Sequence, residues 1–269
     1  MNKNETTENF PVAQLIRPAL RPHVMAFYHF VRAGDEIADA PLLEPQEKIK
    51  QLDAMAVALQ DETNNTLPEA TALRQSLKKT GVTPQHALDL LHAFKQDATK
   101  RRYDTWKELL DYCNYSANPV GRYMLALHGI EEEEAWESND ALCTILQITN
   151  HLQDCGEDYR ELDRIYIPLD MMEQHGTSPE ELAYDESTPA LRDTIDAMLQ
   201  LMEPMMILGR ELPFFVPDKM LRLDTAVISV LAESMIDALY KRDPLCENAK
   251  PSKGAKILAI IKGIGRAFL

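Results

Sequence analysis

Apolar residues recur along most of this chain at intervals of three and four positions, which is the spacing of one face of an α-helix. Leu88, Leu91 and Phe94 form one such series, and the stretch 199–208 contains another. No segment shows a convincing alternation of apolar and polar residues, and no Asn-Gly pair marks a hairpin turn. The pattern therefore predicts an all-α protein with roughly eight to ten helices.

Prolines and hydroxyl-bearing residues mark where several of these helices begin. Thr83, Ser178 and Thr188 each precede a proline, so a capping side chain stands directly before a residue suited to the first helical position. Thr105 and Glu108 have the spacing of a capping box, in which each side chain bonds the backbone N–H of the other residue. These signals indicate helix starts independently of the apolar pattern.

The composition is that of a globular protein with an acidic balance. The hydrophobic fraction is 45%, and 28 Lys and Arg stand against 43 Asp and Glu, which gives a formal net charge of −15. This surplus argues against nucleic acid as a partner, because phosphate binding needs a basic surface. No repeat of fixed period and no low-complexity linker divides the chain, so we expect residues 1–269 to form a single domain.

Targeting signals and cysteine usage indicate where the protein acts. The N-terminus lacks the basic start and apolar run of a secretory signal, and no stretch is long and apolar enough to cross a membrane. The four cysteines have neither CxxC spacing nor a secretory context, which argues against zinc and disulfides. We therefore expect a cytoplasmic protein with reduced thiols.

A stripe of polar residues runs along the helix expected at 22–41. Its members, at positions i, i+4, i+7 and i+11 of one helical face, are Tyr28, Arg32, Asp35 and Asp39. The rest of this helix is largely apolar. The two aspartates lie one turn apart and repel each other, a cost that a bound cation would reverse.

A second stripe runs along the helix expected at 141–160, which is again apolar elsewhere. Its members, at positions i, i+3, i+7 and i+11, are Gln147, Asn150, Asp154 and Asp158. A polar stripe on so apolar a helix favours a cavity or a buried network over the surface. Two such stripes make one shared cavity the more economical interpretation.

The acidic pairs have two interpretations, an exposed helix face or a metal site. A single acidic pair one turn apart is common on solvated helices and by itself indicates no function. Two pairs, each extended by amide, Arg or Tyr side chains, are less easily explained by chance. Carboxylate oxygens suit Mg²⁺, which keeps several waters and binds substrate phosphates. Two facing pairs could hold a cluster of Mg²⁺ ions against a diphosphate leaving group.

These segments resemble the squalene/phytoene synthase family of all-α isoprenoid synthases. The two aspartate-rich motifs of that family look like Asp35–Asp39 (DEIAD) and Asp154–Asp158 (DCGED), and its RIYxP pattern appears at Arg164–Pro168 (RIYIP). The likeness extends from about Glu8 to about Tyr240, nearly the whole chain. It implies a helical isoprenoid synthase fold around a central cavity, with a prenyl diphosphate as substrate.

Within the family, the segments ENFPVAQLI and DYCNYSANPVGRYML are most similar to the hopanoid-pathway branch of hydroxysqualene synthases. That resemblance implies that presqualene diphosphate is ionised and the cation captured by water, which gives hydroxysqualene and diphosphate. A near relative would instead condense two farnesyl diphosphates to presqualene diphosphate, squalene or dehydrosqualene. A third alternative, a non-catalytic helical assembly factor, is disfavoured because all four aspartates are present. No nicotinamide cofactor is expected, because Gly263-Ile264-Gly265 is not a dinucleotide fingerprint.

The resemblance also assigns site residues. The implied Mg²⁺ ligands are Asp35, Asp39, Asn150, Asp154 and Asp158. Tyr28 and Arg32 complete the implied catalytic set. The implied diphosphate-binding residues are Arg32, Arg122, Gln147 and Arg164.

Other residues near these motifs carry weaker predictions. Arg122 has apolar neighbours and follows Pro119, which should break or kink its helix, and this combination favours a cavity position. The basic run 100–102 could bind phosphate or form a surface turn, and both interpretations stay open. His151 is expected to serve packing or the rim of the site.

The tail 250–269 differs in composition from the rest, with five basic residues and no Asp or Glu. On a helix, one face carries Ile257, Ile261, Ile264 and Phe268, with Lys262 and Arg266 opposite. Such a helix can rest on an anionic membrane or pack on the domain, and the sequence leaves both open. A membrane contact would bring the protein to the inner face of the membrane, where other enzymes of the squalene and hopanoid pathway could meet it.

Overall fold

The computed structural model describes residues 16–250 and 252–268, and within these ranges regular structure is helical, apart from one isolated bridge between Arg102 and Ile165. The α-helices are α1 (Arg21–Asp39), α2 (Pro45–Gln60), α3 (Pro68–Thr80), α4 (Gln85–Asp97), α5 (Trp106–Ser116), α6 (Asn118–Leu127), α7 (Glu133–Gln153), α8 (Cys155–Leu162), α9 (Leu169–His175), α10 (Pro189–Gly209), α11 (Lys219–Lys241) and α12 (Lys253–Phe268). Two 3₁₀ helices are η1 (Pro179–Ala183) and η2 (Leu212–Phe215). The all-α prediction is confirmed.

The helix count in the described residues exceeds the expected eight to ten, partly because one expected helix is divided in two. The helix expected at 141–160 is α7 followed by α8, since Asp154 between them has φ −107° and ψ 7°. Hydrogen bonds continue on both sides, from Asp154 N to Asn150 O and from Asp158 N to Asp154 O. A second break was expected: α5 ends before Ala117 and α6 begins at Asn118, so the break predicted near Pro119 is confirmed.

Three of the four predicted helix starts carry the predicted cap. The exception is α4, which begins at Gln85 with Pro84 as its N-cap, so Pro84 is not the first helical residue and Thr83 is not the N-cap. Thr105 Oγ1 accepts a hydrogen bond from Glu108 N at 3.2 Å, and Thr188 Oγ1 accepts one from Leu191 N at 3.1 Å. Ser178 forms a reciprocal capping box at the start of η1. Each cap satisfies a backbone N–H that has no partner within the helix.

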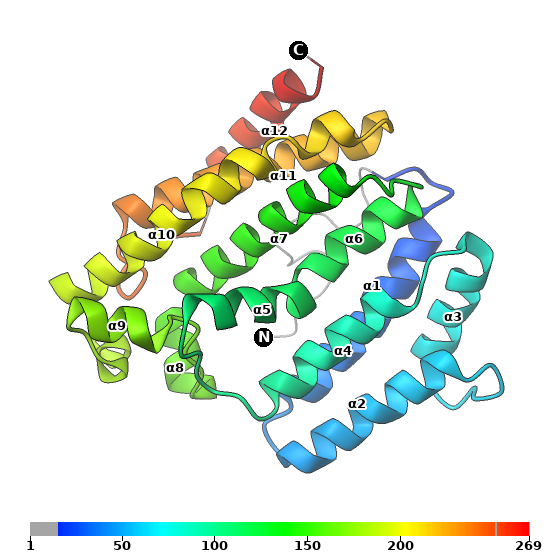
Figure 1. Cartoon of the computed structure of the whole chain (residues 1–269), viewed down its shortest axis with the longest axis horizontal. Helices are drawn as coiled ribbons and strands as arrows, with labels where there is room; N and C mark the ends of the chain where they lie inside the picture. Colours follow the sequence, from blue (N-terminus) through cyan, green and yellow to red (C-terminus); the bar gives the residue numbers. More distant parts are fainter. Residues whose placement is uncertain (1–15, 251, 269) are drawn as a thin grey trace.

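Two hydrophobic cores share the central helices. Figure 1 shows how these helices are arranged. The larger core joins α5, α7, α9, α10 and α11, and it contains the buried Met198, Met202 and Met206. The smaller core joins α1–α4 with Tyr123 of α6. Helices α6 and α7 approach closely because Gly121 has no side chain: a Cβ there would lie 1.9 Å from Asn139 Oδ1. The two cores therefore meet along α6 and α7.

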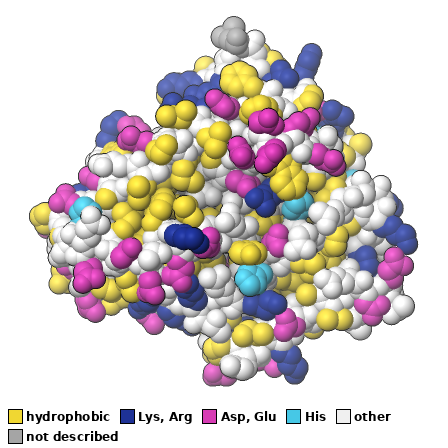
Figure 2. Space-filling view, viewed as in Figure 1, with side chains coloured by type: hydrophobic (Ala, Val, Ile, Leu, Met, Phe, Trp, Pro, Cys, Tyr) yellow, Lys and Arg dark blue, Asp and Glu magenta, His cyan; other side chains and the backbone are white. Residues whose placement is uncertain are grey.

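The last helix, α12, packs along α11 at the edge of the molecule (Figure 1). It contacts α11 through small residues, including Ala259 and Gly263, while several of its isoleucines stay exposed. Figure 2 shows hydrophobic and Lys or Arg side chains together at this end of the molecule. No helix in the part of the chain that the structure describes is long and apolar enough to span a bilayer.

Candidate active site

A cavity of about 430 Å³ opens where the two cores meet. Helices α1, α4, α5, α6, α7 and α8 and the loop after α8 all contribute to its wall. Of the site residues predicted from the sequence, those that line it are Tyr28, Arg32, Asp35, Asp39, Gln147, Asn150, Asp154, Asp158 and Arg164. The two polar stripes therefore border one shared cavity.

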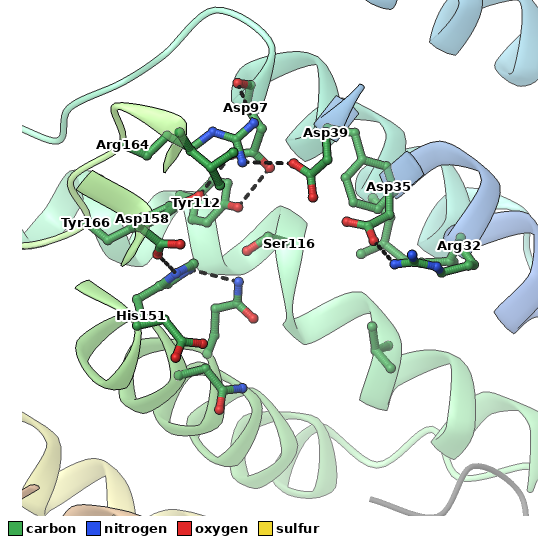
Figure 3. A pocket seen from close by; sticks show the side chains of 18 of the residues that line it. Arg32, Asp35, Asp39, Asp97, Tyr112, Ser116, His151, Asp158, Arg164 and Tyr166 are labelled. Atoms are coloured by element: carbon green, nitrogen blue, oxygen red, sulfur yellow. Dashed lines mark hydrogen bonds and ion pairs between the residues drawn. The ribbon is translucent and has the colours of Figure 1, made fainter. Parts of the chain in front are cut away.

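The first acidic pair projects from α1 and is held by two arginines (Figure 3). Arg32 donates a hydrogen bond to Asp35 Oδ2, and its Nε also lies 3.2 Å from Glu36 Oε1. Arg164 Nη1 donates to Asp39 Oδ1 at 3.1 Å. Each carboxylate of the pair thus has its own cation, which offsets the repulsion between them.

Arg164 reaches α1 because the chain reverses sharply after α8. Asp163 adopts the left-handed conformation, with φ 52° and ψ 39°, directly after the end of the helix. Arg164 then lies only 6% exposed, and its Nη2 donates to the main-chain oxygen of Asp97 at 3.2 Å. A single guanidinium therefore joins the loop after α8 to the ends of α1 and α4.

The basic run 100–102 stabilises this reversal. Arg101 Nη1 donates to Leu162 O at 3.1 Å, and Arg102 Nη2 contacts Asp163 Oδ1 at 2.5 Å. Lys100 forms an ion pair with Glu108. These three side chains are engaged with the protein itself and do not line the cavity.

The structure adds Asp97, a cavity residue that the sequence did not single out. It is buried at the end of α4, where Tyr112 Oη donates to its Oδ2 at 3.0 Å and Tyr166 Oη lies 3.5 Å from its Oδ1. Burial raises the pKa of Asp97 to about 7, although Arg164 and Tyr112 favour the ionised form. The sequence did contain a signal, because Asp97 lies seven positions after Leu90 on the apolar face of α4.

His151 also lines the cavity, where the sequence predicted packing or the rim. Its ring stacks on Tyr166 with centroids 3.4 Å apart, so it does pack, but its polar edge faces the site. Its Nε2 lies 2.9 Å from Gln147 Nε2, and its Nδ1 lies 3.8 Å from Asp158 Oδ2. With Gln147 donating, the ring proton of neutral His151 sits on Nδ1 and faces Asp158. Gln147 lies four positions before His151 and Asp158 lies seven positions after it. These helical spacings could have indicated that His151 faces the cavity.

The donor set around the second acidic pair fits a magnesium ion. Asn150 Oδ1 is buried and has no hydrogen-bond partner among the described residues. Asp154 Oδ1 already attracts a cation, since Lys250 Nζ lies 2.7 Å away. Within the described ranges no three His, Cys, Asp or Glu side chains form a ready-made metal cluster. This arrangement suits Mg²⁺, which takes much of its shell from water and substrate phosphates.

Arg122 lies away from the cavity, contrary to the expected position. It forms a two-bond ion pair with Asp140 of α7, with Nε 2.9 Å from Oδ1, and its guanidinium lies 5.4 Å from the Trp136 ring centroid. Val120 is the residue of this segment that lines the cavity, and Arg122 follows two positions later on α6. Its hydrogen bonds to Asp140 raise the pKa of Arg122 and commit the side chain to the α6–α7 contact.

Known proteins with a similar sequence or structure agree on one family. The squalene/phytoene synthase family matches residues 3–255. Hydroxysqualene synthase of Rhodopseudomonas palustris is 44% identical over 91% of this chain and 84% of its own length. The enzyme of the same name from Zymomonas mobilis is 42% identical over 99% of this chain and 90% of its own length.

A solved structure extends the agreement to the fold. Squalene synthase HpnC from Alicyclobacillus acidocaldarius superposes with a TM-score of 0.77 at 30% identity, and the match covers 86% of each chain. This similarity, together with the helical architecture, shows that the cavity lies within an isoprenoid synthase fold. The sequence match over almost the whole chain, together with this fold, shows that the protein belongs to the squalene/phytoene synthase family of enzymes.

Proposed function

We propose that this enzyme is a Mg²⁺-dependent hydroxysqualene synthase. It ionises presqualene diphosphate, in which the C–O bond breaks and diphosphate leaves with the electron pair. A water oxygen then bonds to the rearranged C30 cation and loses a proton. The products are hydroxysqualene and diphosphate, and no electrons are gained or lost, so no nicotinamide is required.

The observation that carries this proposal is that both acidic pairs border one cavity. We infer that Asp35 and Asp39 bind Mg²⁺ from one side and that Asn150, Asp154 and Asp158 bind it from the other. When bound, Mg²⁺ would supply positive charge that stabilises the departing diphosphate.

The arginines of the cavity have separate tasks in this proposal. Arg32 can turn from Asp35 toward a diphosphate oxygen, because its guanidinium has five N–H donors and is not fully buried. Arg164 is engaged with Asp39 and the Asp97 carbonyl, so it keeps the first pair in place. Gln147 holds His151 and thereby helps to fix the side of the cavity that carries Asp158.

The remainder of the wall suits a hydrocarbon cation. Its apolar part comes from α1, α4, α6 and α8, and its members are Val31, Leu90, Phe94, Val120 and Leu162. The rings of Tyr28 and Phe94 also line the cavity and could stabilise positive charge through their faces. Such a wall excludes bulk water while the cation is present, so that capture by one water can be controlled.

The choice of presqualene diphosphate rests on the two relatives named hydroxysqualene synthase, which are 44% and 42% identical to this chain. We would incubate the purified full-length enzyme with Mg²⁺ and presqualene diphosphate or farnesyl diphosphate separately, without nicotinamide. In water enriched in oxygen-18, presqualene diphosphate should yield isotopically labelled hydroxysqualene by mass spectrometry. Conversion of farnesyl diphosphate alone would instead support a head-to-head condensing enzyme and overturn the proposal.

A further inference from the structure

The last helix presents small residues to the protein and large apolar residues to the outside. Ala259 and Ala267 on the inner side are 1% and 6% exposed. Gly263 lies so close to α11 that a Cβ there would stand 2.8 Å from Val227 Cα. Arg266 also turns inward, where it donates to Ser229 Oγ at 2.8 Å and pairs with Glu233 at 2.9 Å. The helix is thereby fixed on α11 in a defined orientation.

The opposite side, here called the outer face of α12, is built from apolar side chains that remain 47–62% exposed. Its members are Ile257, Leu258, Ile260, Ile261, Ile264 and Phe268. The adjoining η2 contacts both α11 and α12, and its Phe214 is 72% exposed. So many large apolar groups on one helix form a contiguous patch, which in a soluble domain marks an interaction surface.

The charge around the outer face narrows the choice of partner. The segment 250–269 carries five basic residues and no acidic one, in a chain whose formal net charge is −15. Lys262 is exposed on this helix. Glu233 of α11 is paired with Arg266 of α12 and with Arg210. The patch is therefore apolar, with the exposed Lys262 on the same helix, in a segment that carries no acidic residue.

A second copy of the chain is a poor occupant for such a surface. In a twofold dimer the same patch would face itself, so the basic segments of the two copies would approach and repel each other. An anionic bilayer meets both requirements, because its acyl region accepts the apolar side chains and its head groups attract the lysines. We propose that the outer face of α12, continued by Phe214, docks on the surface of an anionic membrane.

This docking would bring the bilayer close to the active-site cavity. Lys250 contacts Asp154 at 2.7 Å, and Gln153 Nε2 donates to Ala249 O at 3.2 Å. Helix α12 begins three residues after Lys250, a span of at most about 10 Å. A membrane-bound α12 thus places its first turn beside the second acidic pair. If the proposed function holds, the C30 substrate and product would have only a short path between lipid and cavity.

The test is co-flotation of the full-length enzyme with vesicles of phosphatidylcholine alone or with about 30% phosphatidylglycerol. We expect binding to the anionic vesicles and little binding to the neutral ones. Replacing Ile257, Ile261 and Phe268 with Gln should lower the partition coefficient on anionic vesicles about tenfold or more. A matched control makes the same replacement at Leu42 and Val57. These two side chains are 95% and 55% exposed and lie far from α12 in the sequence, so this variant should bind the vesicles like wild type.

The outcomes separate membrane docking from folding and from the reaction. Turnover of detergent-dispersed substrate and the thermal unfolding midpoint should be unchanged in the α12 variant, which shows that fold and chemistry are intact. Equal flotation of wild type and the α12 variant would overturn the proposal. A wild-type dimer that becomes a monomer in this variant by sedimentation, without vesicle binding, would overturn it in favour of self-association.

Discussion

The two acidic pairs of the cavity have the same sequence spacing but different surroundings. Asp35 and Asp39 sit on one unbroken helix, and arginines contact both carboxylates. Asp154 lies at the junction of two helices, where its contacting cation is Lys250 from the segment before α12. The side chains of Lys250 and Arg164 are 45% and 8% exposed, so the second pair has the more easily displaced partner.

This difference suggests a division of labour within one site. The first pair is pre-positioned chiefly by the buried Arg164, which holds Asp39 before any ion arrives, while the partly buried Arg32 contacts Asp35. The second pair holds an exposed lysine and an orphaned amide oxygen, so it can exchange its cation at low cost. Each of the following experiments either removes the difference between the two acidic pairs or measures its effect.

The largest effect is expected when either pair loses a charge. Asp35→Asn and Asp154→Asn should each lower kcat/KM by about 10²–10³-fold, because each removes a negative charge that faces the cation and the leaving group. Steady-state turnover of presqualene diphosphate at saturating Mg²⁺ measures this. The control is Asp111→Asn, an exposed carboxylate paired with Lys107 on α5. Wild-type turnover in either cavity variant would remove that pair from the proposed site.

A smaller loss is expected when the buried arginine is shortened. Arg164→Lys should reduce turnover about 10–100-fold, since one ammonium lacks the planar fork that reaches both Asp39 and the Asp97 carbonyl. The thermal midpoint should also fall by a few degrees. Arg210→Lys, in a half-exposed pair with Glu233, is the matched control. If both variants behave alike, Arg164 does not pre-position the first pair.

The pH dependence of stability tests the environment beside the first pair. Burial raises the pKa of Asp97 from 3.8 to about 7, so between these values the folded protein keeps a proton that the unfolded chain has lost. The free energy of unfolding should therefore fall as the pH rises through this window. Between pH 5 and pH 8, Asp97→Asn should remove on the order of 1–2 kcal/mol of that fall in urea unfolding. If the free energy of unfolding falls equally in wild type and in Asp97→Asn, the buried Asp97 does not have a raised pKa. Asp111→Asn, at an exposed carboxylate, is the control.

The smallest effect is expected at the exposed partner of the second pair. Lys250→Met should raise the apparent affinity for Mg²⁺ a few-fold, because the lysine and the ion compete for Asp154. Titration of Mg²⁺ against turnover measures this, and the thermal midpoint should stay nearly constant. Lys95→Met, which breaks an exposed pair with Asp53, is the control. A lower Mg²⁺ affinity would show that Lys250 assists the ion and does not compete with it.

Sequence periodicity was sufficient for the helical fold and for the two polar stripes of the cavity wall. Both polar stripes stand out because carboxylates interrupt otherwise apolar helices, and the structure brings all four aspartates to one cavity. The division of the second stripe at Asp154 was missed, since a change in one residue's backbone dihedral angles leaves the apolar pattern intact. Local pattern thus predicts which face of a helix is polar, but not where its axis turns.

Tertiary contacts determine the positions of the residues that were predicted wrongly from the sequence or were not identified from it. Arg122 has the apolar neighbours of a cavity residue, yet Asp140 lies within reach on α7 and binds its guanidinium. Asp97 depends on partners far along the chain, Arg164 and Tyr166, and His151 stacks on the same Tyr166 in the loop after α8. No local rule specifies such partners, because they are set by how α4, α7 and the loop after α8 pack together.

The central claim is that two dissimilar acidic pairs form one cation-dependent diphosphate site. Calorimetric titration of inorganic diphosphate into the full-length enzyme, with and without Mg²⁺, tests it without relying on turnover. We expect binding only when Mg²⁺ is present, and loss of that binding in both Asp35→Asn and Asp154→Asn. Diphosphate binding that needs no Mg²⁺, or that survives either substitution, would contradict the account.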